Sequence, residues 1–157
     1  MPTSIFGPHQ DDFYPLLGRI IALGSVIDRQ LRDLVNHYVI EPGKDVGNMS
    51  TYDVLKKAKQ FCDDIEEEEN KDEMLRYLCA AQRATNRRNL YAHQLFPAVS
   101  IETGAEVSTW GTKKYSEELR LGENLEVMKE DVLIFSALII HWRDTIQPLA
   151  ALVFSKR

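Results

Sequence analysis

Residues 17–38 read LGRIIALGSVIDRQLRDLVNHY, and this stretch decides the fold class. Its apolar positions recur in alternating steps of three and four residues, which is the spacing that lines one face of an α-helix packed in a bundle. The pattern predicts one long helix that begins at about Asp11 or Asp12, either of which is a suitable N-cap, and ends at Tyr38. Its apolar face consists of Leu17, Ile20, Gly24, Ile27, Leu31, Leu34 and Tyr38.

Two glycines interrupt this predicted helix, at positions 18 and 24. Glycine is a poor helix former, because it loses much backbone freedom on folding and contributes no side chain. Gly18 and Gly24 therefore either mark places where another helix approaches closely or simply weaken the helix.

Two further helices are predicted in the middle of the chain. Ser50-Thr51-Tyr52-Asp53 resembles a capping box, which predicts a short helix that ends at about Cys62. An acidic run, Glu66 to Glu69, is expected to form a solvated connection. A third helix is predicted from about Asp72 to His93, and its second half becomes polar.

The last part of the chain changes pattern twice. Residues 98–110 alternate apolar and polar side chains around Thr103-Gly104, which predicts a short β-hairpin. A final helix is predicted from about Asn124 to the region 146–154, with Pro148 kinking or interrupting it. Its buried face is expected to contain Leu125, Met128, Val132, Phe135, Ile139, Trp142, Ile146, Leu149 and Val153.

These elements predict an all-α fold, an up-down helical bundle of four to five helices with a short β-hairpin insertion before the last long helix. Residues 1–10 contain Pro2, Gly7 and Pro8 and are expected to form a flexible N-terminal tail. Residues 11–157 are expected to form a single helical domain, because a chain of this length suffices for one core.

The charge of the chain limits how it would bind nucleic acid. The net charge is −5, whereas proteins that coat long nucleic acids are usually basic. Any contact with nucleic acid is therefore expected to be local. The best local cluster of cations is Arg76, Arg83, Arg87 and Arg88.

Composition also bears on compartment and cofactors. No apolar run approaches the roughly 20 residues that span a bilayer, and Met1 to Ser4 lack the pattern of a secretory signal, which predicts a cytoplasmic protein without membrane contact. Cys62 and Cys79 are expected to be reduced core thiols, with a disulfide as the alternative. Without a Cys/His cluster of ligand spacing, neither a structural zinc nor another cofactor is expected.

The segment Arg88-Asn89-Leu90-Tyr91-Ala92-His93 carries the groups with functional chemistry. Arginine presents a planar fork of donors that matches phosphate oxygens, and histidine can take and return a proton near neutral pH. Asn89 and His93 share one helix face, whereas Arg88 stands about 140° around an ideal helix from His93. Either the long Arg88 stem bridges this offset, or a second copy of the helix supplies the partner.

The spacing Arg88-Asn89-x-x-x-His93, with Ala92 before the histidine, resembles the motif of HEPN domains. The predicted order of elements over roughly residues 12–150 is also similar to that family. The resemblance implies an all-α domain that pairs through its motif helices. It also implies that arginine and histidine from both protomers form one composite cleft, where active members cut RNA without a metal and leave a cyclic phosphate.

The resemblance implies roles for individual residues. Arg88 would bind the scissile phosphate, His93 would transfer a proton and Asn89 would orient the site. Some members of the family place an acidic residue on the first helix near the motif, and Asp28 would fill that role here. The further candidates for substrate binding are Arg83 and Arg87.

Each of these residues also has an ordinary structural interpretation. His93 would cap the last carbonyl groups of the third helix. The neighbouring arginines would form a solvated face that pairs with the acidic run at 66–69. Asp28 would pair with Arg32, four residues further along the first helix. The stretch Arg32 to His37 meets the same loose spacing as the motif, but it alternates with expected core positions and is not counted as a site.

The first functional expectation is a metal-independent endoribonuclease of the HEPN type, of the toxin or defence kind, in which the 2′-hydroxyl of the RNA attacks the phosphate. Expected partners are RNA, a second copy of the chain, and a cognate antitoxin or regulatory protein, but not DNA. The alternative, favoured by the acidic net charge, is a non-catalytic HEPN-like dimeric module that binds a partner protein or RNA. A third interpretation is a helical regulator or structural dimer in which the motif is accidental.

Overall fold

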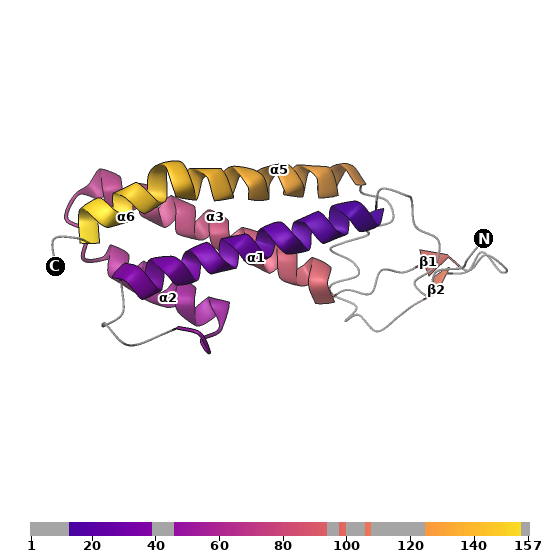
Figure 1. The fold of residues 1–157 in the computed structure, drawn as a ribbon, viewed down its shortest axis with the longest axis horizontal. Helices are drawn as coiled ribbons and strands as arrows, with labels where there is room; N and C mark the ends of the chain where they lie inside the picture. Colours follow the sequence, from indigo (N-terminus) through magenta and orange to yellow (C-terminus); the bar gives the residue numbers. More distant parts are fainter. Residues whose placement is uncertain (1–12, 39–45, 94–97, 100–105, 108–124, 155–157) are drawn as a thin grey trace.

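Four helices account for nearly all of the chain that the computed structural model describes, residues 13–38, 46–93, 98–99, 106–107 and 125–154. The first three are α1 (Phe13–Tyr38), α2 (Thr51–Cys62) and α3 (Glu68–His93) (Figure 1). The final helix consists of α5 (Leu125–His141), a π-helical turn (Trp142–Ile146) and α6 (Gln147–Phe154), which run on without a break. The all-α prediction is therefore confirmed, with four helices in the described residues.

The helices do not alternate strictly in direction, as an up-down bundle would. α3 runs antiparallel to the final helix, whereas α1 and α2 both run parallel to it (Figure 1). The reason is that residues 46–51 lie alongside the second half of α1 before α2 begins. The Val46 N–H donates to Asn36 Oδ1 at 3.1 Å, the Val46 carbonyl accepts from Arg32 Nη1 at 2.9 Å, and Thr51 donates to Asp28. The up-down prediction was therefore wrong for the connection between α1 and α2.

The starts of α2 and α3 follow from polar residues in their first turns. Ser50 caps α2, because its Oγ accepts from the Asp53 N–H at 3.1 Å and its hydroxyl donates to the Asp53 carboxylate at 2.8 Å, which confirms the predicted cap. α3 begins at Glu68, about one turn before the predicted start at Asp72. Carboxylates in a first turn are stabilised by the helix dipole, so part of the acidic run is helical rather than a connection.

Pro148 changes the winding of the final helix but does not end it. Just before the proline, the Gln147 N–H donates to the Trp142 carbonyl, which is the five-residue bond of a π-helical turn. A proline has no N–H to donate, and its ring crowds the preceding turn of an α-helix. The wider π turn stands where this crowding would occur, so the predicted interruption is reduced to a local change of pitch.

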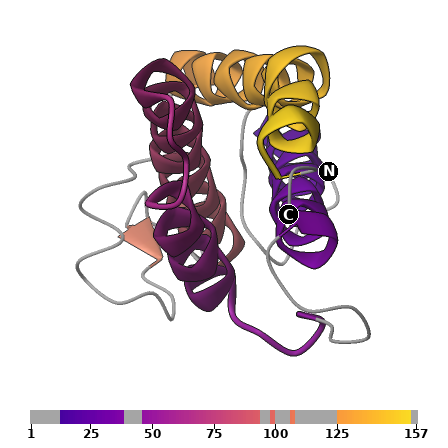
Figure 2. The same ribbon diagram turned by 90° about the vertical axis from the view of Figure 1, so that its left-hand side faces the viewer.

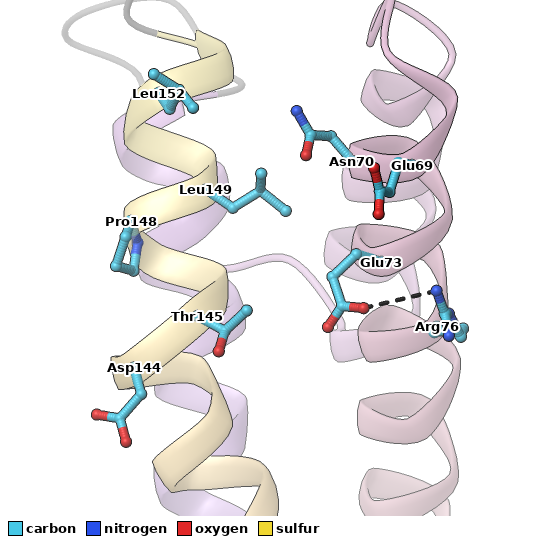
Figure 3. A pocket seen from close by; sticks show the side chains of 9 residues that line it. All are labelled: Glu69, Asn70, Glu73, Arg76, Asp144, Thr145, Pro148, Leu149 and Leu152. Atoms are coloured by element: carbon cyan, nitrogen blue, oxygen red, sulfur yellow. Dashed lines mark ion pairs between the residues drawn. The ribbon is translucent and has the colours of Figure 1, made fainter.

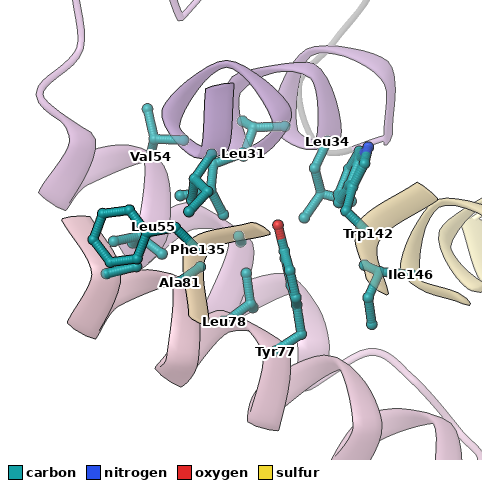
Figure 4. Packing of buried hydrophobic residues seen from close by; sticks show 14 of the residues in the cluster. Leu31, Leu34, Val54, Leu55, Tyr77, Leu78, Ala81, Phe135, Trp142 and Ile146 are labelled. Carbon is teal, nitrogen blue, oxygen red and sulfur yellow. The ribbon is translucent and has the colours of Figure 1, made fainter. Parts of the chain in front are cut away.

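Apolar side chains from all four helices meet in one core, with the final helix bridging α1 and α3 (Figures 2 and 4). The predicted buried faces of α1 and of the final helix are confirmed, since every predicted member is buried or packs against the core. Side chains that are at most 2 % exposed include Ile20, Ile27, Leu31, Leu34, Val54, Leu78, Met128, Phe135 and Ile146.

The hairpin expected over residues 98–110 is not established as part of the fold. The described residues there are β1 (Ala98–Val99) and β2 (Glu106–Val107), which pair antiparallel, Ala98 with Val107 and Val99 with Glu106. The rest of the predicted hairpin, Trp110 included, lies outside the described residues, as does the predicted tail at 1–10.

The two cysteines differ in their surroundings. Cys62 is fully buried, and burial raises the pKa of its thiol to about 11. Cys79 is exposed on α3, so the prediction of two core thiols was wrong for Cys79. Both thiols are free, and the alternative of a disulfide between them is not realised.

Candidate functional site

The predicted motif occupies the last two turns of α3. Arg83 is exposed on this half of the helix, and Arg87, Arg88 and Asn89 are half-buried. His93 is the last residue of α3, and its side chain lies outside the described part of the structure. The helix therefore places the motif where it was predicted, at the C-terminal end of α3 beside the first turns of α5.

Asp131 of α5, which the sequence analysis did not single out, organises this end of the bundle. It is a buried carboxylate, only 7 % exposed, and its Oδ2 accepts from Arg87 Nε at 2.9 Å and from the Tyr91 hydroxyl at 2.5 Å. The Arg87 guanidinium also lies 5.8 Å from the centre of the Tyr91 ring. These contacts join α3 to α5 and neutralise the buried carboxylate.

The ionisation of this cluster follows from burial and from its charges. Burial raises the pKa of the Tyr91 hydroxyl, and the hydrogen bond to the Asp131 carboxylate raises it further, so the phenol stays protonated and donates. The pKa of Arg87 is also raised, because the bond and charge of Asp131 outweigh the opposing effect of burial. The cluster is therefore a fixed arrangement of one cation, one anion and one neutral donor.

Arg88 lies on the side of α3 that faces α1. A Cβ added at Gly24 would stand 2.3 Å from Arg88 Cγ and 2.7 Å from Arg88 Cβ, so only a glycine lets the two helices approach this closely. The close approach predicted for Gly24 is confirmed, whereas a Cβ at Gly18 would meet nothing within 4 Å. The Arg88 Nε is buried and has no hydrogen-bond partner among the described residues, and the same is true of Thr85 Oγ1 one turn earlier.

Asp28 lies one turn after Gly24, but its oxygens are already engaged. Oδ2 accepts from Arg32 Nε at 2.9 Å, and Oδ1 accepts from Thr51 Oγ1 at 2.6 Å. The pairing with Arg32 is the structural alternative that the sequence left open. Asp28 therefore ties α1 to the start of α2, and each of its oxygens already accepts a hydrogen bond.

The arrangement separates the arginines of α3 into two kinds. Arg87 is committed to Asp131, and this accounts for its burial without any ligand. No ion pair joins Arg88 or Arg83 to another described residue, and the Arg88 stem is held in place by its contact with α1. A fixed stem with an uncommitted guanidinium is an arrangement that suits the binding of a phosphate.

A separate hollow of about 470 Å³ lies between the first turns of α3 and α6 (Figure 3). The Glu73 carboxylate there is hydrogen-bonded to His141 Nε2 at 2.8 Å and lies 3.7 Å from Arg76 Nη2. Several carboxylates in one hollow repel a phosphate, so this hollow does not extend the candidate site. Its walls combine acidic and apolar side chains, which include Glu69, Glu73, Asp144, Leu149 and Leu152.

Comparisons with protein-family models, with curated proteins and with solved structures found no match for this chain. Among the described residues, no group of three or more His, Cys, Asp or Glu side chains is arranged to hold a metal ion. No described helix combines the length and the apolar character needed to cross a membrane.

Proposed function

We propose that the chain is a HEPN-like dimeric module that binds RNA at the C-terminal end of α3, with Arg88 as its main phosphate contact. The observation that carries this proposal is the contrast between two adjacent arginines. Asp131 holds Arg87 at 2.9 Å, whereas the buried Arg88 Nε has no acceptor among the described residues. Arg88 as a whole is only half-buried, so an RNA phosphate would meet the part of its side chain that solvent reaches and supply an acceptor that the described chain does not.

The proposed contact is local, which agrees with a net charge of −5. A guanidinium can hold two phosphate oxygens at once, and Asn89, one residue further along, offers an amide for a ribose hydroxyl or a base edge. Arg83 is exposed and lies about one turn before Arg87 on α3. From that position it would reach a neighbouring phosphate. Few phosphates would be neutralised in total, so the affinity should depend only weakly on salt.

Replacement of Arg88 by methionine is expected to weaken binding to a single-stranded RNA by about 10- to 100-fold, because charged hydrogen bonds contribute about 1.5 to 3 kcal/mol. Methionine keeps most of the stem that packs against Gly24 and removes the guanidinium, with its charge and its hydrogen-bond donors. The slope of log K against log salt should fall by about 0.7, the value for one phosphate on a single strand. Fluorescence anisotropy with a labelled RNA at several salt concentrations measures both quantities.

Arg76→Ala is the matched control for this experiment. It removes the same charge from the same helix, but at an exposed position three turns away from Arg88. Binding by Arg76→Ala should stay within about twofold of wild type, as expected of an exposed cation outside the contact. Equal affinities of the wild type and Arg88→Met would refute the proposed contact.

Metal-independent cleavage of RNA is the second candidate function, favoured by the presence of Arg88 and His93 in the same two turns of α3. Around an ideal helix these residues point about 140° apart, so a single chain would not bring both groups to one phosphate. In the cleavage hypothesis a second copy supplies the missing group, and the 2′-hydroxyl of the RNA attacks. His93 would then transfer the proton, and Arg88 would stabilise charge on the phosphorane.

A mixing experiment tests this second candidate. Arg88→Met and His93→Ala chains should each be inactive on labelled RNA, and unfolding and refolding them together should restore part of the activity, because a mixed pair contains one intact combination of groups. Cleavage by wild type should be insensitive to a chelator and absent on DNA. Wild type that binds RNA and leaves it intact would establish the binding module and exclude cleavage.

A further inference from the structure

The final helix carries an apolar face that the described residues leave uncovered. On α5, Leu133 is 70 % exposed, Ile140 is 50 % exposed and Ile134 is 48 % exposed. The opposite face of α5 carries Met128 and Phe135 and is buried in the core. A helix that is apolar on both sides is normally buried on both sides, so the outer face of α5 is suited to binding another protein surface.

The outer face is continuous along the helix. Leu133, Ala137 and Ile140 follow at steps of four and three residues and therefore stand in one row. Ala137 is exposed at the centre of the row, and its small side chain allows a second helix to approach closely. Asp131, which binds α3, points to the other side of α5.

The charges at the two ends of this row are arranged in a self-complementary way. Lys129 and Glu130 precede the row, and Arg143 and Asp144 follow it, all four of them exposed. Along the chain, a positive charge precedes a negative one at both ends of the row. In the opposite direction, the negative charge comes first at both ends. A second α5 laid antiparallel across the first would therefore bring opposite charges together at both ends, whereas a parallel one would bring like charges together.

We propose that a second copy of this chain binds this face, with the two α5 helices antiparallel and the two-fold axis between Ser136 and Ala137. Counting outward from that axis, Leu133 of one copy meets Ile140 of the other. In the same register Glu130 meets Arg143, and Lys129 meets Asp144. Each of these contacts occurs twice, as two-fold symmetry requires.

The apolar contacts would provide most of the affinity, and the charges would fix the orientation. Within one chain, Lys129 pairs with Glu126 at 3.0 Å and Arg143 with Asp144 at 2.8 Å, both at the surface. Exposed pairs of this kind contribute about 0 to 1 kcal/mol, so they are readily exchanged for pairs between copies. Complementary charges in one orientation and repulsive charges in the other are an effective means of selecting the antiparallel pair.

This pairing is independent of RNA binding, because α3 packs on the other side of α5. It leaves the two motif ends apart, on the far sides of the two α5 helices. A dimer formed in this way therefore fits a binding module with two separate RNA contacts. The composite cleft of the cleavage hypothesis would require a different contact between copies, so the mixing experiment also distinguishes the two arrangements.

Sedimentation of the full chain tests the pairing. Wild type is expected to be a dimer. Leu133→Glu is expected to raise the dissociation constant of the dimer at least tenfold and to leave the circular dichroism spectrum unchanged. Tyr52→Glu is the matched control, since Tyr52 is 67 % exposed on α2, away from this face, and its replacement should leave the dimer intact. Wild type that stays monomeric up to roughly 100 μM would overturn the proposal, as would a Leu133→Glu dimer as stable as wild type.

A charge exchange tests the antiparallel register separately. Glu130→Arg and Arg143→Glu should each weaken the dimer, because each places like charges opposite one another. The double variant should recover most of the wild-type affinity, because position 130 is then positive and the facing position 143 of the other copy is negative. Failure of the double variant to recover would exclude this register. RNA binding by the double variant, whose net charge equals that of wild type, should be unchanged, so a failure of the pairing and a failure of RNA binding can be told apart.

Discussion

Replacement of Asp131 by alanine is expected to lower the free energy of unfolding by about 3 kcal/mol, the largest effect of any single substitution considered for this protein. The change leaves the Arg87 guanidinium and the Tyr91 hydroxyl without their shared acceptor, at a position where Asp131 is only 7 % exposed. Arg87 keeps partial contact with solvent after the change. The loss of stability is therefore expected at the lower end of the range for a broken buried ion pair. For a chain of this size, the midpoint of thermal unfolding should fall by roughly 6 to 12 °C.

Asp33→Ala is the control for the Asp131 prediction. It removes an exposed carboxylate from the C-terminal part of α1, and it should change stability by no more than about 0.5 kcal/mol. A double-mutant cycle of Asp131→Ala with Tyr91→Phe separates the hydrogen bond from the ion pair. We expect strong non-additivity, because the Tyr91 hydroxyl donates to the carboxylate that Asp131→Ala removes. Urea unfolding followed by circular dichroism measures all four chains. An Asp131→Ala chain as stable as Asp33→Ala would show that the cluster does not hold α3 to α5.

The helices could be predicted from the sequence because apolar periodicity reports directly on burial. The row from Leu17 to Tyr38 is the buried face of α1, and the Ser50 cap marks the start of α2. The same logic could not give the direction of α2. That direction depends on bonds from Val46 to Arg32 and Asn36, and such contacts between distant polar groups leave no periodic pattern in the sequence.

The position of the motif on α3 was predicted, whereas the partner of Arg87 was not. The motif lies at the end of α3 as expected, but Arg87 is bound to Asp131 instead of being available for a substrate. A signal for Asp131 was present, because it stands between Met128 and Phe135 on the buried face, where a carboxylate requires a partner. Which of the two adjacent arginines would be that partner depends on the rotation of α3 against α5, and single-sequence patterns do not fix that rotation.

The second large effect is expected at Gly24, where alanine should lower the free energy of unfolding by about 1 to 2 kcal/mol even though alanine is the better helix former. The added Cβ would stand 2.3 Å from Arg88 Cγ and 2.7 Å from Arg88 Cβ. The second of these atoms belongs to the base of the side chain, so rotation of the Arg88 stem cannot relieve the whole conflict and the helices must separate slightly. Gly18→Ala is the matched control on the same helix, and it should raise stability by about 0.5 to 1 kcal/mol, because its Cβ would meet nothing within 4 Å.

The Gly24 experiment also reports on the RNA contact, because the substitution displaces the residue proposed to bind phosphate. Gly24→Ala should weaken RNA binding together with stability, whereas Gly18→Ala should leave binding unchanged. Combining Gly24→Ala with Arg88→Ala removes Cγ and Cδ but keeps Cβ, so part of the lost stability should return while RNA binding stays weak. The contradicting result is a Gly24→Ala chain that is as stable as Gly18→Ala and binds RNA normally. In that case the contact between α1 and Arg88 would not position the guanidinium. The assignment of Arg88 as the phosphate contact would then lose its structural basis.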